Sequence, residues 1–248
     1  MPENPLISII TVCYNAEKEI RKTLYSLKEQ SYKNFEHLVI DGLSSDYTLE
    51  IVKKEALPQT IVLSEKDNGL YDAMNKGLNM AKGKYVLFLN AGDTFHSSES
   101  LQHYAEAAKQ DFEIIYGETV IVNSYGVKLR PRHLSVPEKL NKFSFSHGML
   151  ICHQAFMVKK ALTEPYDLKY RFSSDYDWCI NCIKKVNLTK IKNLQEVTID
   201  YLDNGLTDHN KKRSLKERFS IMTYHYGLPL TIYRHFGFFF RALKRGKL

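Results

Sequence analysis

The sequence predicts an α/β fold built on a mostly parallel central sheet. Its first 95 residues alternate short β-branched apolar runs with segments of helical periodicity, a rhythm typical of parallel sheets covered by helices. The runs are almost continuously apolar, as expected for strands that are buried on both faces. With 248 residues, 44% hydrophobic and 25% charged, the chain can bury the core of one large domain.

Strands and helices alternate through the first half of the chain. Residues 6–13 (LISIITVC) form a nearly continuous apolar run, and Ile20, Leu24 and Leu27 have helical spacing in the segment that follows. Strands are expected over residues 6–13, 35–40, 60–63 and 85–89, and helices over residues 17–30, 47–55, 70–81 and 97–110.

The second half is less regular. Strands are expected over residues 112–116, 118–122, 127–129, 150–158 and 197–201, and one helix over residues 173–186. We therefore expect one domain over residues 1–210, with halves at 1–95 and 96–210, followed by a distinct tail over residues 211–248.

The tail is basic and aromatic. It is rich in Lys and Arg and contains the run Phe238-Phe239-Phe240-Arg241. Phenylalanines beside basic residues suit a segment lying at a membrane interface, and they equally suit a helix that packs its Phe face on the domain. The chain has no apolar run of the ~20 residues that a membrane-spanning helix needs, and no signal peptide pattern.

The four cysteines favour reduced thiols over a disulfide framework, because they are few and unevenly spread. Cys179 and Cys182 form a CxxC pair inside the helix expected over residues 173–186, where a buried face explains them better than a redox or zinc site. We expect a cytoplasmic protein that is at most peripheral at the inner face of the plasma membrane.

The chain carries a net charge of +7 and has a pI of about 9.0, which favours an anionic partner. Nucleic acid, a nucleotide and an acidic membrane all fit this charge. Nucleic-acid binding would require basic residues clustered with exposed aromatics on a sheet, whereas here the basic residues gather in the tail. We therefore do not expect a nucleic-acid partner.

Polar residues gather after the strands of the first half. Ligands of such sheets lie beyond the carboxyl ends of the strands, so these positions indicate the site. An acidic rim attracts a phosphate only when a cation lies between them, which predicts a divalent ion bound by carboxylates and phosphate oxygens. The segments in question are Tyr14-Asn15-Ala16-Glu17, Asp41 to Asp46, Ser64 to Gly69 and Asn90-Ala91-Gly92-Asp93.

Five motifs in order resemble the family 2 glycosyltransferases, which have the GT-A fold. They are SIITVCYN, VIDGLSSDYT, SEKDNGLYDAMNKGL, GKYVLFLNAGD and SSDYDW, and the match covers about residues 6–210. The pattern is most similar to the subgroup that builds bacterial capsule, O-antigen and exopolysaccharide. The resemblance implies an inverting enzyme that moves a sugar from a nucleotide-diphosphate sugar donor to a glycan or lipid-linked saccharide, with Mn²⁺ or Mg²⁺ as cofactor.

The resemblance also implies a set of donor-binding residues. Asp41 matches the family residue that accepts from the donor base, and Asp67 matches one that faces the ribose. The alternatives are that Asp41 makes a turn with Gly42 and that Lys76 is a solvated helix lysine. The residues expected at the donor are Thr11, Tyr14, Glu17, Asp41, Asp67, Asp72, Lys76 and Asn90.

Asp93 matches the last Asp of the family's DxD motif, the residue that touches the metal ion. Here the first position of that motif is the neutral Asn90, which leaves Asp93 with the diphosphate, water and one further ligand. His209 lies where many GT-A enzymes place a late metal-contacting residue, with Thr207 and Asp208 as rivals.

Asp175 and Asp177 compete for the role of general base. Inversion requires one carboxylate that takes the acceptor proton while the nucleotide leaves from the opposite face. Residues two apart in a helix point in different directions, so only one of the pair can face the site. Asp175 lies nearer the helix start, where negative charge is favoured, and it matches the catalytic Asp of the family.

Two residues are expected on the acceptor or diphosphate side. His153, in the segment CHQAF, hydrogen-bonds the diphosphate or acceptor, or is a structural histidine. Arg213 clamps the diphosphate, or belongs to a solvated run of charges.

Two other functions compete with glycosyl transfer. A sugar-phosphate nucleotidyltransferase would carry a Gly- and Arg-rich loop after the first strand, where this chain has Tyr14-Asn15-Ala16-Glu17. A non-catalytic nucleotide-binding module is the second alternative, and the ordered motifs count against it.

Overall fold

The first half of the chain forms four parallel strands. The computed structural model describes residues 5–203 and 210–243, with side chains to residue 240. Strand β1 (Ile7–Cys13) lies between β2 (Phe35–Asp41) and β4 (Tyr85–Phe88), and β3 (Ile61–Ser64) pairs with the outer side of β2. All residues of β1 and β2 are buried, as their continuous apolar sequences predict.

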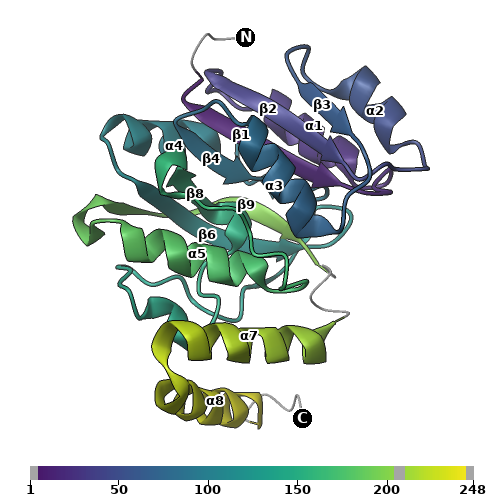
Figure 1. Ribbon diagram of the computed structural model, residues 1–248. Coiled ribbons are helices and arrows are strands. Elements are labelled where there is room, and N and C mark those ends of the chain that lie inside the picture. The colour runs from purple at the N-terminus through teal and green to yellow at the C-terminus, as the bar shows by residue number, and fades with distance from the viewer. Residues whose placement is uncertain (1–4, 204–209, 244–248) are drawn as a thin grey trace.

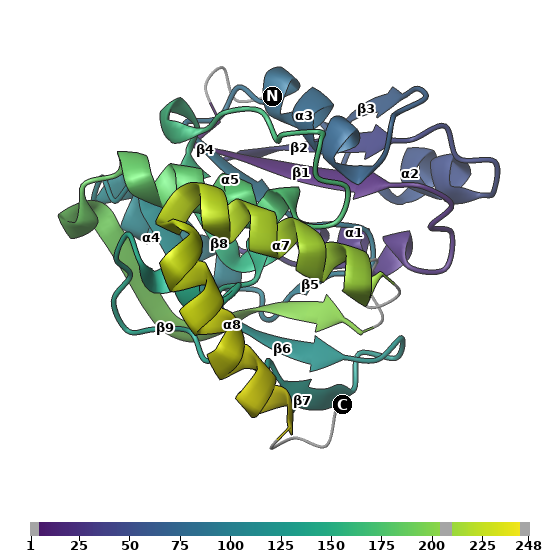
Figure 2. The ribbon, with the colours of Figure 1, turned by 60° about the horizontal axis from the view of Figure 1, so that its bottom comes forward.

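Helices cover both faces of these strands (Figures 1 and 2). Helix α3 (Leu70–Met80) packs on one face, and it approaches so closely that a Cβ at Gly77 would clash with Ile10. Helices α1 (Ile20–Lys28) and α2 (Thr48–Glu55) pack together on the other face, against Val39 of β2.

The second half extends the same sheet with mixed strand directions. The order from β4 onward is β8 (Phe156–Lys159), β6 (Ile114–Val122), β9 (Ile191–Leu202) and β5 (Thr94–Phe95). Short β7 (Lys128–Pro131) pairs with the end of β6. Helices α4 (Ser100–Lys109) and α5 (Ser174–Lys185) belong to this half, and the predicted α/β class is confirmed.

Several predicted boundaries in this half are wrong. The two strands predicted over 112–116 and 118–122 form the single strand β6, and the last strand begins at Ile191 instead of residue 197. The strand predicted over 150–158 is confined to β8, because residues 153–155 form a 3₁₀ turn. Apolar content alone does not distinguish a strand from a buried turn.

The C-terminal segment consists of two helices, α7 (Lys211–Tyr226) and α8 (Leu228–Leu243). Gly227 joins them with a positive φ of 82°, a conformation that favours glycine. Helix α7 packs on α5, and α8 packs on α7 at the outside of the molecule (Figure 1). Within the described residues, no helix is both long and apolar enough to cross a membrane.

Helix α8 turns part of its aromatic face toward the domain, as one of the two expectations for the tail predicts. Phe238 packs against the core, whereas Phe236, Phe239 and Phe240 are exposed. The division of the chain at residue 210 stays a proposal, because α7 is docked on the domain through α5.

Candidate active site

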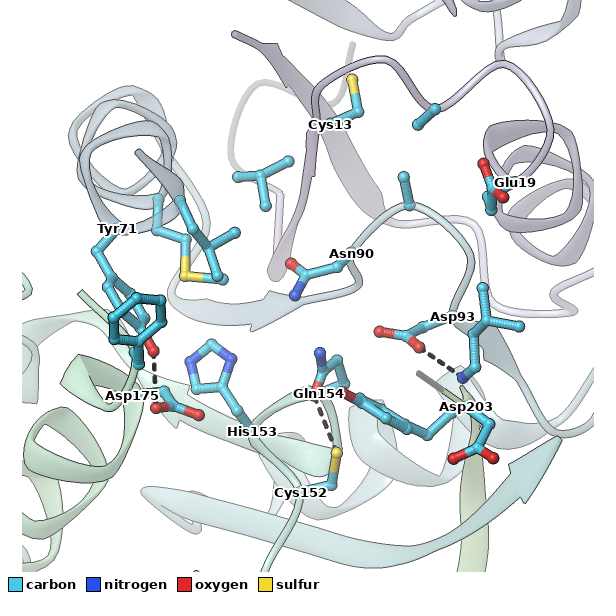
Figure 3. A pocket seen from close by; sticks show the side chains of 18 of the residues that line it. Cys13, Glu19, Tyr71, Asn90, Asp93, Cys152, His153, Gln154, Asp175 and Asp203 are labelled. Carbon is cyan, nitrogen blue, oxygen red and sulfur yellow. Dashed lines mark hydrogen bonds between the residues drawn. The ribbon is translucent and has the colours of Figure 1, made fainter. Parts of the chain in front are cut away.

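A cavity of about 700 Å³ opens at the carboxyl ends of β1 and β4. This is the edge of the sheet at which ligands of open α/β folds bind. Its wall is formed by the loop after β1, the start of α3, the loop after β4, the 3₁₀ turn before β8, the start of α5, the end of β9 and one residue of α7. Figure 3 shows Tyr71 and Asp175 on one side and Asp93 on the other, with Asn90 and His153 between them.

Asp175 is the second residue of α5 and lines the cavity. Its Oδ1 accepts a hydrogen bond of 2.9 Å from the hydroxyl of Tyr71, at the start of α3 (Figure 3). Burial raises the pKa of Tyr71 well above its usual value, so the phenol keeps its proton and acts as a donor. The N-terminal turn of α5 favours a negative charge at Asp175.

Asp177 points away from the cavity, as expected for a residue two positions further along the helix. It is buried, and its carboxylate lies 2.7 Å from Nε2 of His225 and 3.1 Å from Nδ2 of Asn181. This pair joins α5 to α7. Of the two competing carboxylates, only Asp175 is in contact with the cavity.

Asp93 occupies the other end of the cavity. Its Oδ1 accepts from the backbone N–H of Leu202 at 3.0 Å, and the tight turn before it uses a positive φ of 101° at Gly92. Burial raises the pKa of Asp93 to about 7. Neighbouring Asn90 also lines the cavity, and its Oδ1 is buried without a hydrogen-bond partner. This end therefore contains a buried carboxylate and one buried amide oxygen, Oδ1 of Asn90, that has no hydrogen-bond partner.

These oxygens fit a hard cation shared with a ligand. Across residues 5–203 and 210–243, no group of three His, Cys, Asp or Glu side chains is arranged to hold a metal ion. Mg²⁺ commonly binds through one or two carboxylates and the phosphates of its substrate, so a complete protein cage is not required. Asp93 and Asn90 fit that pattern, and the predicted ligand His209 lies outside the described residues.

His153 lines the cavity from the 3₁₀ turn before β8. Its Nε2 lies 2.6 Å from the hydroxyl of Tyr166, and its ring packs edge-on against Trp178. Burial lowers the pKa of His153 to about 4, so the ring is neutral near pH 7. The neutral His153 ring therefore makes a structural hydrogen bond and also lines the cavity.

Tyr14 lines the cavity and leaves 65% of its side chain exposed. A Cβ at Gly42 would clash with the carboxylate of Asp67 and would lie 3.4 Å from the Tyr14 ring. The three residues therefore lie close together beside the cavity, and the carboxylate of Asp67 accepts from the N–H of Gly69 at 2.8 Å.

The structure places three other expected donor residues in the scaffold. Thr11 is fully buried and its hydroxyl lies 3.0 Å from His37. Asp41 is fully buried, and its carboxylate accepts from the backbone N–H and hydroxyl of Ser44 and from the hydroxyl of Ser64. Glu17 accepts from the N–H of Tyr47. None of these three side chains lines the cavity.

Asp72 and Lys76 are engaged at the start of α3. Asp72 accepts from the N–H of Asn68 at 2.8 Å, and Lys76 pairs with Glu65 at 2.9 Å while donating to the carbonyl of Lys66. These contacts fix the loop between β3 and α3. Arg213 is exposed on α7 and does not line the cavity.

Tyr71, Arg132 and Arg218 are among the lining residues that were not predicted as site residues. Tyr71 holds Asp175, and Arg132 and Arg218 bring two guanidinium groups into the cavity wall. Arg132 follows an edge strand, and Arg218 follows a run of surface charges on α7. Their contribution depends on tertiary placement, and no spacing in the sequence indicates it.

The chain matches known glycosyltransferases in sequence. The profile of "Glycosyl transferase family 2" matches residues 8–164. The chain is 31% identical to a PGL/p-HBAD biosynthesis glycosyltransferase of Mycobacterium tuberculosis, over 72% of this chain and 70% of that protein. It is 24% identical to the Escherichia coli UDP-Glc:alpha-D-GlcNAc-diphosphoundecaprenol beta-1,3-glucosyltransferase WfgD, over 88% of this chain and 85% of that protein.

Solved structures share the fold. TarS of S. aureus superimposes with a TM-score of 0.71 at 19% identity, over 94% of this chain and 72% of that one. The mannosyltransferase PcManGT of Pyrobaculum calidifontis, solved with GDP-Man and Mn²⁺, gives a TM-score of 0.56 at 17% identity, over 94% of this chain and 74% of that one. These likenesses agree with the GT-A arrangement that the motifs implied.

Proposed function

The chain belongs to glycosyl transferase family 2 and is an inverting glycosyltransferase, and from this premise we propose how its cavity carries out the transfer. The observation that carries the proposal is the placement of Asp175 across the cavity from Asn90 and Asp93 (Figure 3). A sugar bound between the two ends has a carboxylate on one face and the donor phosphates on the other. This is the arrangement that inversion requires.

The donor nucleotide binds beyond β1 and β2 in this proposal. The surface formed by Tyr14, Gly42 and Asp67 suits a flat base and a ribose, because it offers an exposed aromatic ring and a carboxylate. Asp41, Thr11 and Glu17 support the loops of this space from the scaffold. Asp72 and Lys76 act in the same way on the loop before α3.

The diphosphate lies at the Asp93 end, together with Mn²⁺ or Mg²⁺. Asp93 and the unpartnered Oδ1 of Asn90 are the residues that would hold the ion with the diphosphate. The ion supplies positive charge against the charge that develops on the departing phosphate. The structure of PcManGT with GDP-Man and Mn²⁺ supports a divalent cation at a fold of this kind.

Asp175 accepts the proton of the acceptor hydroxyl through the carboxylate oxygen that Tyr71 does not engage. The acceptor oxygen then forms a bond to the anomeric carbon while the bond from that carbon to the phosphate oxygen breaks. The electron pair of the broken bond leaves with the nucleoside diphosphate, and the configuration inverts. His153 forms the neutral wall between the two ends.

The acceptor is proposed to be a saccharide, either free or linked to a lipid, in the synthesis of a bacterial surface polysaccharide. WfgD, by its name, acts on a diphosphoundecaprenol-linked sugar, and its similarity covers most of both chains. A lipid-linked acceptor places the enzyme at the inner face of the plasma membrane, with its body in the cytoplasm.

Helix α8 supports such a peripheral contact. Ile232, Tyr233, Phe236, Phe239 and Phe240 are exposed along its outer face at spacings of a helical stripe. Residues 218–248 contain six Lys or Arg and no Asp or Glu, so this segment as a whole is electrostatically suited to anionic lipid. The arrangement is that of an interfacial helix.

The donor is tested by thermal unfolding with a panel of UDP-, GDP- and dTDP-sugars, each with and without Mn²⁺. We expect one nucleotide class to raise the Tm, with a larger shift when Mn²⁺ is present, and slow release of the free nucleotide diphosphate. NMR of the sugar product reports whether the anomeric configuration inverts. A panel that produces neither stabilisation nor nucleotide release contradicts the proposal.

The membrane contact is tested by co-sedimentation with vesicles of phosphatidylcholine alone and of phosphatidylcholine mixed with phosphatidylglycerol. The protein should bind only the mixed vesicles, and Phe236→Glu with Phe240→Glu should abolish the binding. Tyr125→Glu removes an aromatic that is 87% exposed in the turn after β6, and it serves as the control. Equal binding by wild type and the α8 variant would exclude this helix as the contact.

A further inference from the structure

Two arginines, Arg132 and Arg218, line the same cavity. Arg132 follows β7, and Arg218 lies in the second turn of α7. Neither was needed for the donor site described above. Their chemistry is distinctive, because a guanidinium presents five N–H donors in a planar fork that matches phosphate oxygens.

Arg132 is held rigidly by the backbone of the segment before the 3₁₀ turn. Its Nη1 donates to the carbonyl of Leu150 at 3.1 Å, and its Nη2 donates to the carbonyl of Met149 at 3.0 Å. These two bonds use two of the five donors and fix the plane of the guanidinium. The remaining donors are available to a ligand in the cavity. Neither of the two hydrogen bonds that hold the guanidinium is made to a carboxylate.

Arg218 is positioned by the docking of α7 on the start of α5. The hydroxyl of Ser214 lies 2.9 Å from that of Ser173, and the Glu217 carboxylate accepts from the N–H groups of Arg171 and Phe172. Arg218 comes one helical turn after Ser214, so it shares the face that is turned toward α5. Its guanidinium lies 5.9 Å from the ring of Tyr176.

Both guanidinium groups lack an anionic partner in the described part of the chain. No carboxylate there lies within 4.0 Å of either one, and Nε of Arg218 is buried without any hydrogen bond. The nearby acids of the cavity are engaged elsewhere, Asp175 with Tyr71 and Asp203 with Arg130. A half-buried charge without a partner is unfavourable, and a bound anion would relieve it.

The location of Arg218 indicates on which side of the cavity this anion binds. The guanidinium of Arg218 lies 5.9 Å from the ring of Tyr176, the residue that follows Asp175 on α5, and its charge opposes the burial that raises the pKa of Tyr71. Asp93, where we place the donor diphosphate, lies at the other end of the cavity, with Asn90 between the two ends (Figure 3). An anion bound by Arg218 is therefore on the side of the cavity where Asp175 deprotonates the acceptor hydroxyl.

We infer that Arg132 and Arg218 form a phosphate site for the acceptor, and that the acceptor sugar is itself a glycosyl phosphate or diphosphate. This inference rests on the proposed function and specifies the acceptor class. Two guanidinium groups bind the phosphate attached to the acceptor sugar and orient its reactive hydroxyl toward Asp175. The same phosphate chemistry also occurs in the donor, so the experiment must separate the two sources.

The test uses two sets of synthetic acceptors that carry the same sugars. In one set the sugar is joined to a short alkyl chain through a diphosphate, and in the other it is joined directly as an uncharged glycoside. Wild type should use the diphosphate acceptor with at least about tenfold higher kcat/KM, because charge-assisted bidentate contacts are strong. Arg132→Gln and Arg218→Gln should each lower the kcat/KM for the diphosphate acceptor about 10- to 100-fold, mainly by raising KM.

The uncharged acceptor and the donor provide the discriminating measurements. Both variants should keep wild-type kcat/KM for the uncharged glycoside and wild-type Kd for the nucleotide diphosphate. Arg21→Gln, which alters an exposed arginine paired with Glu55 on the far helices α1 and α2, is the matched control and should change nothing. Weaker nucleotide binding with an unchanged acceptor KM would assign the arginines to the donor and overturn the inference.

Wild type alone gives a second measurement that does not depend on the folding of the variants. Inorganic pyrophosphate, added with excess Mn²⁺ and saturating donor, should compete with the diphosphate acceptor and leave transfer to the uncharged glycoside unaffected. Equal use of the two acceptor sets by wild type would overturn the acceptor phosphate site. Transfer to either acceptor would still support the glycosyltransferase, so the two failures are distinguishable.

Discussion

The two ends of the cavity differ in how completely their polar groups are satisfied. At the base end, Asp175 is held by the hydroxyl of Tyr71, a residue 104 positions away in the sequence. At the donor end, Oδ1 of Asn90 has no partner, and burial raises the pKa of Asp93 to about 7. We therefore expect the proposed base end to be assembled before any ligand arrives, and the proposed donor end to be completed by what binds there.

This difference follows from where the side chains come from. Asp175 and Tyr71 lie at the starts of two helices, and packing of the helices fixes both. Asn90 and Asp93 lie in a loop after β4 whose backbone is fixed by the hydroxyl of Thr23. We expect changes at the base end to affect the chemical step, and changes at the donor end to affect binding as well.

The largest effect is expected from Asp175→Asn, because an amide cannot take the acceptor proton. We expect kcat to fall by about 10³-fold, within the range for loss of a general base, while the nucleotide Kd stays within about twofold of wild type. Steady-state transfer assays and calorimetric nucleotide titration measure the two quantities. Asp177→Asn is the matched control: it breaks the pair with His225 and should lower the Tm, with kcat largely retained.

The sequence predicts a cavity residue when a local pattern, such as the end of a strand or the start of a helix, marks its position. Asp93 and Asp175 each follow a local signal, the end of a buried strand and the start of a helix, and the structure places both at the cavity. Asp41 follows the same strand-end signal, yet Ser44 and Ser64 surround its carboxylate in the core. Position after a strand therefore indicates the site edge but not the direction of the side chain.

The other residues of the cavity are placed by tertiary contacts, which local sequence patterns do not predict. The first four strands were predicted to within one residue at each end and the helices that follow them to within three residues, because each is marked by local periodicity. Arg218 reaches the cavity only because Ser214 and Glu217 dock α7 on the start of α5. No spacing in the sequence indicates contacts between these segments, so local patterns fail at this point.

Asp93→Ala is expected to have the second largest effect. It tests whether the donor end is completed by an ion that Asp93 holds. Loss of the carboxylate should lower kcat/KM by about 10²-fold and remove the Mn²⁺-dependent part of the nucleotide's Tm shift. Differential scanning fluorimetry with and without Mn²⁺ measures this shift. Asp111→Ala, an exposed carboxylate paired with lysines, is the control. An unchanged response to Mn²⁺ in Asp93→Ala would place the ion elsewhere.

Two buried histidines predict a loss of stability in acid. Burial lowers the pKa of His37 to about 3 and that of His153 to about 4, so both fold in the neutral form. The unfolded chain binds these protons near pH 6.5, and the stabilising contribution is therefore full above that pH and is lost as pH falls toward 4. At pH 5 each should cost about 2 kcal/mol of unfolding free energy.

Denaturant unfolding between pH 8 and pH 5 checks this slope. His37→Gln should reduce the dependence of the unfolding free energy on pH by the contribution of one histidine. The variant also loses the contacts of the ring with Thr11 and Thr60. A slope that His37→Gln does not change would mean that this ring is protonated in the folded protein.

Tyr71→Phe has the smallest expected effect and examines the base end alone. The ring that stacks on Tyr166 is kept, while Asp175 loses the hydroxyl donor that holds Oδ1. Because a single hydrogen bond to a charged group is removed and the carboxylate itself remains, kcat should fall by about tenfold, with the nucleotide Kd unchanged. Tyr85→Phe, which removes a phenol bound to the carbonyl of Phe112 away from the cavity, should leave kcat near wild type. If Tyr71→Phe instead weakened nucleotide binding and spared kcat, the phenol would belong to the donor end, and the contrast between a preassembled base and an unfinished donor site would fail.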